Sequence, residues 1–512
     1  MSVTAVNPIL SGFYPDPTIC AVGDDYYIVN SSFCYFPGLP IMHSKDLAHW
    51  EQIGNAMDRN SQLPLAKDEV SRGLFAPTIR YNNGTYYLIC TNVTFGGNFI
   101  ITAKDPKGPW SEPHYIEGAE GIDPSLFFDD DGKCYYTGTH PNPDGCQYDG
   151  DWYIYTQELD IENFKLVGEC HNVWNGAMKG VHWPEGPHLY KIGEYYYILH
   201  AEGGTGPNHA ISVARSKNVF GPFENNFNNP IFTHRHLGVE YPIKYVGHGD
   251  LFQAANGEWY IIMLAVRPID GKTTMGRETF LAKVTFEEDW PVVNVGVGIL
   301  TKEVEINLPE FKPECTKDLT PMSEKNYNFT SMKELPYSVL TLHNPDEDLW
   351  KLTDKGLAIK GGVKEPSYLC VRQDSHAFEA TCEVLREGLG DGVKAGLILF
   401  QNAKYNLRVE FDGCKGSAIL MNDGVEEVID SMIMAEDKIS MFISVKGLTA
   451  SLFIGNDQKV EPLAKNLDIS TLSTEVAGGF VGCTVGMYVT AGLDNKDASA
   501  TFKSFSYHPG VY

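Results

Sequence analysis

Basic residues are scarce in this chain of 512 residues. It has 40 Lys and Arg against 66 Asp and Glu, which gives a formal net charge of −26. Such a surface repels nucleic acid and anionic membranes, so we expect neither as a partner. The charge is compatible with a neutral ligand such as a sugar, although a need for solubility explains the acidity equally well.

Long apolar runs are also missing. No stretch is apolar over the roughly 20 residues that a membrane-spanning helix needs, although 43% of the residues are hydrophobic. The first residues, 1–8, have neither the basic region nor the apolar region of a secretory signal. We therefore expect a cytoplasmic protein, unless a leader segment has been removed.

Paired cysteines of the C-x-x-C type are absent, and the total of 11 cysteines is odd. Several of them, such as Cys20, Cys90 and Cys134, stand inside apolar stretches. We interpret these as reduced core residues, which is typical of a reducing compartment. No two histidines have the tight spacing of a zinc motif, so metal chemistry has weak support.

A repeated hairpin pattern fills the first 300 residues. Each copy has an apolar anchor, a turn that contains glycine, and a second strand rich in aromatic residues. The anchors are Ile19, Ile79, Leu126, Leu189 and Leu251, at spacings of 60, 47, 63 and 62 residues. Repeats of this size that are built from hairpins are typical of propeller blades, so five copies predict a five-bladed β-propeller.

Residues at the same point of each blade should form a ring around the propeller axis. This point is occupied by Asp16, Ala76, Asp123, Glu185 and His248, with Glu185 one place out of strict register. Each Asp-Pro pair alone is more typical of a turn. Three carboxylates held close together cost energy, however, so we interpret the whole ring as functional.

Glu185 lies in the sequence Trp183-Pro184-Glu185-Gly186-Pro187. The prolines and the glycine restrict the backbone, which suits a side chain that must be aimed. An aromatic run follows at residues 195–198 and predicts a buried strand. Glu185 should therefore stand at the start of a central strand, and not be one more surface carboxylate.

Hydrolysis of a glycosidic bond needs two carboxyl groups that flank it. Asp16 and Glu185 belong to the first and fourth blades, across the axis from each other. This favours inversion, because a water molecule fits between them. The charge of Asp123 should keep Glu185 protonated near neutral pH. A propeller that binds sugars without cleaving them is the alternative from another class of function.

Other side chains near the ring each have two interpretations. Arg277 is either a donor to sugar hydroxyl groups or the partner of Glu278 in a surface ion pair. His248 could bind Ca²⁺ or Zn²⁺ with the carboxylates, or could be an ordinary core histidine. Three aromatic residues either form sugar-facing walls or belong to the propeller core: Phe33, Phe75 and Trp183.

The hairpin repeat ends near residue 308, and the rest of the chain has a different pattern. We assign 1–308 to the propeller and 309–325, which contains three prolines, to a linker. Within 326–512, short alternating strands such as 395–400 and 405–411 predict an antiparallel β-sandwich. No cluster of catalytic residue types occurs there.

Five motifs together resemble glycoside hydrolase family 43, above all its two-domain β-xylosidases and α-L-arabinofuranosidases. The motifs are Phe13-Tyr14-Pro15-Asp16-Pro17, Gly121-Ile122-Asp123-Pro124-Ser125, Trp183-Pro184-Glu185-Gly186-Pro187-His188, Gly247-His248-Gly249-Asp250 and Gly276-Arg277-Glu278-Thr279. The resemblance covers the whole chain. It implies an all-β protein in which the five-bladed propeller is followed by a concanavalin-like β-sandwich.

By position, the resemblance implies an inverting mechanism with Asp16 as general base and Glu185 as general acid. Asp123 would tune and orient the acid. The binding residues that it implies are Arg277, His248 and Thr205. No cofactor would be required, and Ca²⁺ near His248 stays open. Phe75 stands where many of these β-xylosidases have Trp, and Ile122 where an aromatic is common, so the resemblance does not decide between xylose and arabinofuranose.

The resemblance also implies a sandwich that packs on the propeller and lends one loop to close the mouth of the site. A closed pocket admits only chain ends. We therefore predict exo-acting release of xylose, arabinofuranose or both from the non-reducing ends of xylo- and arabino-oligosaccharides. A chiefly α-L-arabinofuranosidase activity is the alternative within the family. A homo-oligomer is compatible with these expectations.

Overall fold

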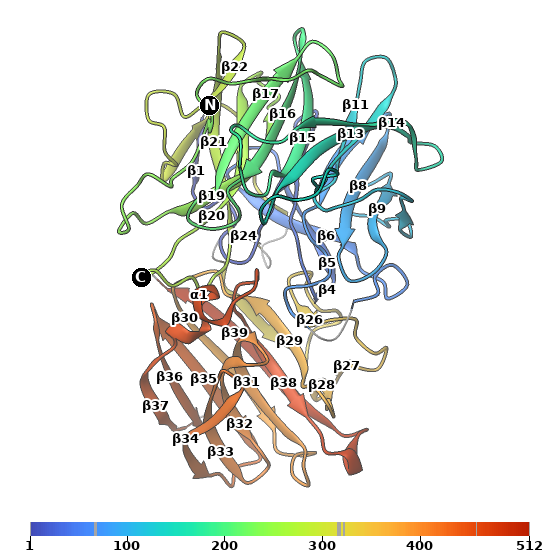
Figure 1. Cartoon of the computed structure of the whole chain (residues 1–512). Helices are drawn as coiled ribbons and strands as arrows, with labels where there is room; N and C mark the ends of the chain where they lie inside the picture. Colours follow the sequence, from blue (N-terminus) through green and yellow to red (C-terminus); the bar gives the residue numbers. More distant parts are fainter. Residues whose placement is uncertain (1, 66–68, 315–318, 321–322, 457, 511–512) are drawn as a thin grey trace. The chain divides into compact units, whose positions relative to one another are not determined.

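The computed structural model describes residues 2–65, 69–314, 319–320, 323–456 and 458–510. Almost all of its regular structure is β-strand (Figure 1), which confirms the prediction of an all-β protein. The chain divides into two compact units. Unit 1 contains residues 1–10, 14–267 and 277–314, and unit 2 contains residues 11–13, 268–276 and 315–512.

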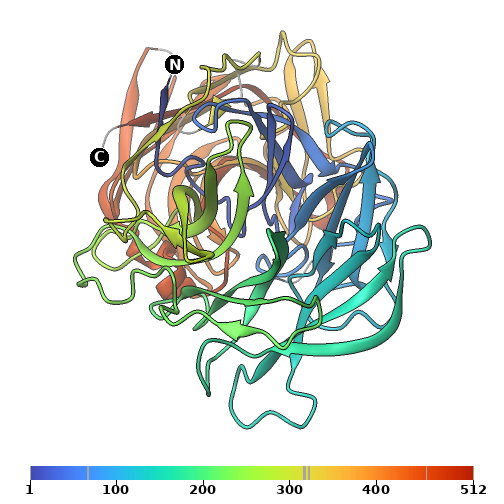
Figure 2. The same cartoon turned by 90° about the horizontal axis from the view of Figure 1, so that it is seen from above.

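Unit 1 is the predicted five-bladed propeller, and Figure 2 shows its blades following one another around a central axis in sequence order. Each blade is an antiparallel sheet whose strands neighbour one another in chain order. The strands of blades one to five are, in order, β2 (Thr18–Val22), β3 (Asp25–Val29), β5 (Gly38–Ser44) and β6 (Trp50–Met57); β7 (Thr78–Asn82), β8 (Thr85–Asn92), β9 (Gly97–Ala103) and β10 (His114–Tyr115); β11 (Ser125–Phe128), β12 (Cys134–Pro141), β13 (Trp152–Asp160) and β14 (Lys165–Trp174); β15 (Glu185–Ile192), β16 (Tyr195–Glu202), β17 (Ala210–Ser216) and β18 (Glu224–Asn225); β19 (Lys244–Gln253), β20 (Trp259–Val266), β21 (Glu278–Glu287) and β22 (Trp290–Val293).

The aromatic and β-branched runs are buried because each blade packs on a neighbour at both faces. In β8, Leu88 belongs to the core between blades one and two, whereas Ile89 belongs to the core between blades two and three. In β20, Ile261 and Ile262 likewise face opposite neighbours. Successive side chains of a strand point to opposite faces, so a strand between two cores is apolar at every position.

The seam between blade five and blade one includes two further strands. β1 (Val3–Val6) pairs with β23 (Glu303–Ile306) in an antiparallel ribbon. Ala5 and Val304 of this ribbon share a buried cluster with Ile28 of blade one and Ile262 of blade five. Side-chain packing therefore closes the ring at this seam.

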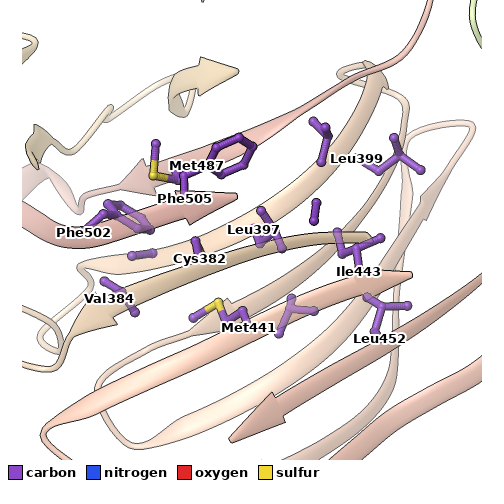
Figure 3. Packing of buried hydrophobic residues seen from close by; sticks show 14 of the residues in the cluster. Cys382, Val384, Leu397, Leu399, Met441, Ile443, Leu452, Met487, Phe502 and Phe505 are labelled. Carbon is purple, nitrogen blue, oxygen red and sulfur yellow. The ribbon is translucent and has the colours of Figure 1, made fainter. Parts of the chain in front are cut away.

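Unit 2 is a sandwich of two large antiparallel sheets, as the alternating strands predict. The strands of one sheet are, in spatial order, β27 (Trp350–Thr353), β28 (Gly356–Lys360), β39 (Ser499–Gly510), β30 (Ala377–Leu385), β35 (Lys438–Lys446), β36 (Thr449–Gly455) and β37 (Val460–Asp468), with β25 (Lys325–Asn328) paired to β39. Those of the other are β34 (Val425–Ile433), β33 (Lys415–Asn422), β32 (Tyr405–Phe411), β31 (Lys394–Asn402), β38 (Thr484–Thr490), β29 (Ser367–Arg372) and β26 (Leu340–Leu342). Side chains such as Leu397, Ile443 and Phe502 fill the space between the sheets (Figure 3).

The remaining elements are short. They are the strands β4 (Tyr35–Phe36) and β24 (Leu319–Thr320), the helix α1 (Thr474–Ala477) and the 3₁₀ turns η1 (Ser470–Leu472) and η2 (Leu493–Asn495). No helix among the described residues is long and apolar enough to cross a bilayer. Cys20, Cys90 and Cys134 are buried free thiols, as predicted.

Two short segments from the first part of the sequence belong to unit 2. Ser11 Oγ donates to the backbone carbonyl of Asp374 at 2.6 Å. The backbone N–H and the Oγ1 of Thr273 donate to the carboxylate of Glu475 at 2.7 and 2.8 Å. The boundary between residues 314 and 315 falls inside the predicted linker 309–325, part of which lies outside the described residues.

Candidate active site

The candidate carboxylates stand where the innermost strands of their blades begin. Asp16 and Asp123 each precede a strand by two residues, at β2 and β11. Glu185 is the first residue of β15, as predicted. Its offset within the repeat has a physical cause, because a β-bulge between Glu185 and His188 inserts an extra residue into β15.

The backbone near these strand starts has an uncommon conformation. Asp16, Asp123, Trp183 and His248 have φ angles of 49°, 54°, 44° and 48°, and Phe33 has 50°. Residues other than glycine rarely adopt this left-handed region, and those that do concentrate at functional sites. The repeat therefore reproduces one strained conformation in several blades.

Asp16 is buried and held by several groups. Arg277 Nη1 donates to its Oδ1, and the Ser31 hydroxyl donates to its Oδ2 at 2.6 Å. His248 Nδ1 lies 3.8 Å from Oδ1. Glu278 pairs instead with Arg267, at 2.8 Å. The interpretation of Arg277 as the surface partner of Glu278 is therefore wrong.

Glu185 has the pKa that a general acid needs near neutral pH. Burial, and after it the charge of Asp16, raises its pKa to about 7. The charge of Arg277 and a hydrogen bond with Thr205 act in the opposite direction. The structure thus brings Asp16, Arg277, Thr205 and Glu185 into one electrostatic group.

Asp123 interacts with both the charge and the backbone of the acid residue. Burial, then Glu185, then Asp16 raise its pKa well above the ordinary value. Its Oδ2 accepts a hydrogen bond from the Gly186 N–H at 3.1 Å, directly after Glu185. Two carboxylates that repel each other titrate as a pair, so Asp123 and Glu185 together retain a proton near neutral pH.

Trp183 fixes the path of the chain into Glu185. Its backbone N–H donates to the Gly150 carbonyl at 2.8 Å. A Cβ atom at Gly150 or Gly204 would lie 2.9 or 2.6 Å from the Trp183 ring, so only glycine allows this approach on each side. Thr139 Oγ1 donates to the Pro184 carbonyl at 2.8 Å. These contacts hold the segment before Glu185 against blade three and against the loop after β16.

The three candidate aromatic residues differ in exposure. Phe33 is 2% exposed, and its ring lies 5.2 Å from that of Phe75 and 5.7 Å from the Arg277 guanidinium. Phe75 and Trp183 are only partly buried. Phe33 is thus a packing residue beside Arg277, whereas Phe75 and Trp183 have surface left for a ligand.

His248 packs against the chain that carries Glu185. A Cβ atom at Gly186 would lie 2.9 Å from its ring. Burial lowers the pKa of His248, which keeps the imidazole neutral. In the described part of the chain, no group of three His, Cys, Asp or Glu side chains is arranged to hold a metal ion. The donor set expected of a Ca²⁺ site near His248 is therefore not assembled by side chains there.

A second buried cluster, around Asp250, was not predicted from the sequence. Its carboxylate accepts from Thr18 Oγ1 at 2.8 Å, from both terminal nitrogens of Arg80 at 2.9 and 3.1 Å, and from Tyr190 Oη at 2.7 Å. His188 Nδ1 lies 3.1 Å from Arg80. These residues come from blades one, two, four and five, so the cluster joins four blades near the axis. The motif around His248 already contained Asp250, but nothing in the sequence pointed to Arg80.

Two residues that hold Asp16 in place, Asn30 and Ser31, were not predicted from the sequence. Asn30 Nδ2 donates to the carbonyls of Tyr14 and Pro15, both at 3.0 Å, and thereby holds the backbone that leads to Asp16. Ser31 binds the Asp16 side chain itself. The signal available in the sequence was a polar run, residues 30–32, directly after an apolar stretch, and the structure buries this run.

Comparison with known proteins agrees with this geometry. Residues 5–291 match the family described as Glycosyl hydrolases family 43, and residues 326–508 match the Beta xylosidase C-terminal Concanavalin A-like domain. A xylosidase/arabinosidase of Butyrivibrio fibrisolvens is 49% identical over 99% of both chains. A non-reducing end α-L-arabinofuranosidase of Bacteroides ovatus is 34% identical over 98% of this chain and 94% of its own.

A solved structure extends the likeness to three dimensions. The xylan β-1,4-xylosidase of Bacillus halodurans superposes with a TM-score of 0.89 at 31% identity, over 98% of this chain and 100% of its own. The resemblance noted in the sequence motifs is thus confirmed along the whole chain. This protein belongs to glycosyl hydrolases family 43.

Proposed function

We propose that the protein is an exo-acting, inverting hydrolase that releases xylose and arabinofuranose from the non-reducing ends of xylo- and arabino-oligosaccharides. The observation that carries the chemistry is the partly buried Glu185, whose pKa is raised to about 7, in one group with the ion pair of Asp16 and Arg277. The substrate class is supported by the names of the relatives, above all the xylosidase/arabinosidase that is 49% identical.

In the proposed reaction, Glu185 gives its proton to the glycosidic oxygen as that bond breaks. Asp16 takes a proton from a water molecule, whose oxygen bonds to the anomeric carbon from the opposite face. The sugar leaves with inverted configuration, and Glu185 is left ionised and Asp16 protonated until solvent exchange restores both. Asp123 shares the proton that the pair retains near neutral pH, and it orients the chain at Glu185 by accepting from the Gly186 N–H.

Both sugars are proposed because the relatives divide between them. The Butyrivibrio relative is named for both activities and the Bacteroides relative for arabinofuranose alone. A chiefly α-L-arabinofuranosidase activity is therefore the second candidate. By the resemblance, Phe75 stands in place of a tryptophan and Ile122 in place of an aromatic residue, and both are partly buried. The different shapes of these two side chains would affect how well a xylose or an arabinofuranose ring fits the site.

A panel of nitrophenyl β-xyloside and nitrophenyl α-L-arabinofuranoside separates these candidates. We expect turnover of both, and turnover of the arabinofuranoside alone would favour the second candidate. Sugar binding without turnover of any glycoside would establish the non-catalytic alternative. On xylohexaose, xylose and xylopentaose should be the only products at early times, whereas early xylobiose, xylotriose and xylotetraose would overturn exo action.

The stereochemical outcome has its own test. Proton NMR of the first product formed from a β-xyloside should show the α anomer before it equilibrates. Appearance of the β anomer would mean retention, and Asp16 would then be a nucleophile and not a base.

We also propose that the protein resides in the cytoplasm. The support is that the ten described cysteines are all free thiols, three of them exposed. Exposed free thiols are typical of reducing compartments. Fractionation of the source cells followed by immunodetection tests this, and recovery in the secreted fraction would contradict it.

A further inference from the structure

Unit 1 contains a groove that the catalytic site does not use. Its volume is about 450 Å³, and 14 residues line it. This volume falls within the roughly 300–1,000 Å³ of small-molecule sites. The lining comes from blade one, from blade two and from the segment that contains Phe311.

The groove lies at the opposite end of the blades from the catalytic carboxylates. β2 begins two residues after Asp16 and runs for five residues to the turn before Asp25, which lines the groove. Tyr81 and Tyr86 flank the corresponding turn of blade two and also line it. A strand of five residues spans about 13–17 Å, so the groove is a separate site from the catalytic groups.

A continuous series of rings lines the groove. The centroids of Tyr81 and Tyr86 are 4.8 Å apart, those of Tyr86 and Tyr27 5.6 Å, those of Tyr27 and His43 5.3 Å, and those of His43 and Phe311 5.2 Å. Tyr27 and Tyr86 are buried beneath the groove, whereas Tyr81 is 40% exposed and has side-chain surface left for a ligand. Tyrosine rings offer an apolar face and a polar tip, the combination that a sugar ring requires.

The polar groups of the groove are fixed and balanced in charge. His43 is held from both sides, by Asp25 at 2.7 Å and Glu51 at 3.3 Å. Burial alone would raise the pKa of Asp25, but hydrogen bonds from His43 and Lys45 lower it. Four carboxylates and three lysines line the groove together with His43. Such a lining favours a neutral, hydroxyl-rich ligand over an anion or a cation.

We propose that this groove is a second oligosaccharide site, which binds the neutral backbone of a xylan-type chain away from the point of cleavage. The choice of xylan rests on the proposed function, whereas the choice of a neutral sugar rests on the rings and the charge balance. The groove would hold the protein on polymeric material while the other end of the propeller removes terminal sugars.

Affinity electrophoresis of the full chain in gels that contain arabinoxylan tests this proposal. All forms carry Glu185→Gln, which slows turnover so that the polymer stays intact during the run. Tyr81→Ala removes the exposed ring. The apparent affinity for arabinoxylan, calculated from the retardation, should therefore fall about tenfold. Tyr81→Phe keeps the ring and should bind as the parent does. Tyr195→Ala, at the corresponding hairpin of blade four, is the matched control and should also bind normally.

In the otherwise unchanged enzyme, Tyr81→Ala should leave kcat/KM on nitrophenyl β-xyloside unaltered. Equal retardation of Tyr81→Ala and its parent would overturn the second site, and so would retardation by polygalacturonate in place of arabinoxylan. Failure of the proposed function would be distinguishable, because it would abolish glycoside turnover and leave the dependence of retardation on Tyr81 intact.

Discussion

Two buried carboxyl clusters lie along the axis of the same propeller, and their pKa values move in opposite directions. At the strand starts, the pKa values of Glu185 and Asp123 are raised. Near the axis, the pKa of Asp250 is lowered, although burial alone would raise it. The two clusters are close in sequence, because Asp250 follows His248, the blade-five residue of the ring, by only two positions on β19. Position along the chain therefore does not explain why the pKa shifts differ in sign.

The difference lies in the supply of positive charge. The Asp250 carboxylate accepts hydrogen bonds from both terminal nitrogens of Arg80. Arg277 pairs with Asp16, and its charge only partly offsets the burial and repulsion at Glu185. An acid that must keep a proton needs a neighbour that repels its anion, whereas a structural carboxylate needs a cation. One repeat thus yields a reactive cluster in one place and a stabilising cluster in the other.

The largest expected effect follows from removing the proton donor of the reactive cluster. Glu185→Gln should lower kcat/KM on xylobiose by about 10²–10⁴-fold, because general acid catalysis is lost. The loss should be smaller on nitrophenyl β-xyloside, whose leaving group needs little protonation. Steady-state kinetics on both substrates measure this.

The matched control is Glu194→Gln, in the hairpin of the same blade, whose side chain is 81% exposed. It should keep the activity of the parent on both substrates. Equal losses for Glu185→Gln on the good and the poor leaving group would remove Glu185 from the role of acid.

The next effect concerns the stabilising cluster. Asp250→Asn removes the charge that faces Arg80 and leaves a buried guanidinium without its counter-ion. The free energy of unfolding should fall by about 3–5 kcal/mol, the usual cost of breaking a buried ion pair. Urea denaturation followed by tryptophan fluorescence measures it. Asp130→Asn removes an 87% exposed partner of Lys191 and should change stability by less than about 1 kcal/mol.

The sequence predicted the reactive cluster better than the stabilising one. Asp16, Asp123 and Glu185 recur at one point of a visible repeat, and the chemistry of a glycosidase calls for such a set. Arg80 occupies a point of blade two where no other blade carries an arginine, and its partner Asp250 comes 170 residues later. Pairing over such a distance depends on the closure of the ring, which periodicity alone does not encode.

The five blades were also predictable from the sequence, whereas the bulge in β15 and the assignment of two short segments to unit 2 were not. The aromatic hairpins defined five blades because each is buried at both faces. The bulge at Glu185–His188 was visible only as a residue out of register. Nothing in the sequence indicated that residues 11–13 and 268–276 belong with the sandwich unit. They are held by scattered hydrogen bonds, such as those from Ser11 to Asp374 and from Thr273 to Glu475, which leave no periodic trace.

A smaller effect is the pH dependence that the raised pKa imposes. Glu185 must be protonated to act, and its pKa is about 7. The value of kcat/KM should therefore fall about tenfold per pH unit above that pKa. In Glu185→Gln the remaining activity should show no such fall between pH 7 and 9. A parent enzyme with unchanged kcat/KM from pH 6 to 9 would contradict the raised pKa.

The smallest effect concerns stability, and its sign is opposite to that of Asp250→Asn. A carboxyl whose pKa rises from 4.5 to about 7 on folding binds its proton more tightly in the folded state. Its contribution to stability is therefore present below pH 4.5 and is lost as the pH rises through 7. At pH 8 the folded protein bears the cost of an anion that is poorly solvated and lies near Asp16, and Glu185→Gln removes this cost. This variant should be more stable than the parent by about 1–2 kcal/mol at pH 8, with a smaller difference at pH 5. Urea midpoints at the two pH values measure the gain, and Glu194→Gln should show none. A Glu185→Gln variant less stable than its parent at pH 8 would mean that the carboxylate is stabilised in the folded state, as Asp250 is, and that the contrast between the two clusters does not hold.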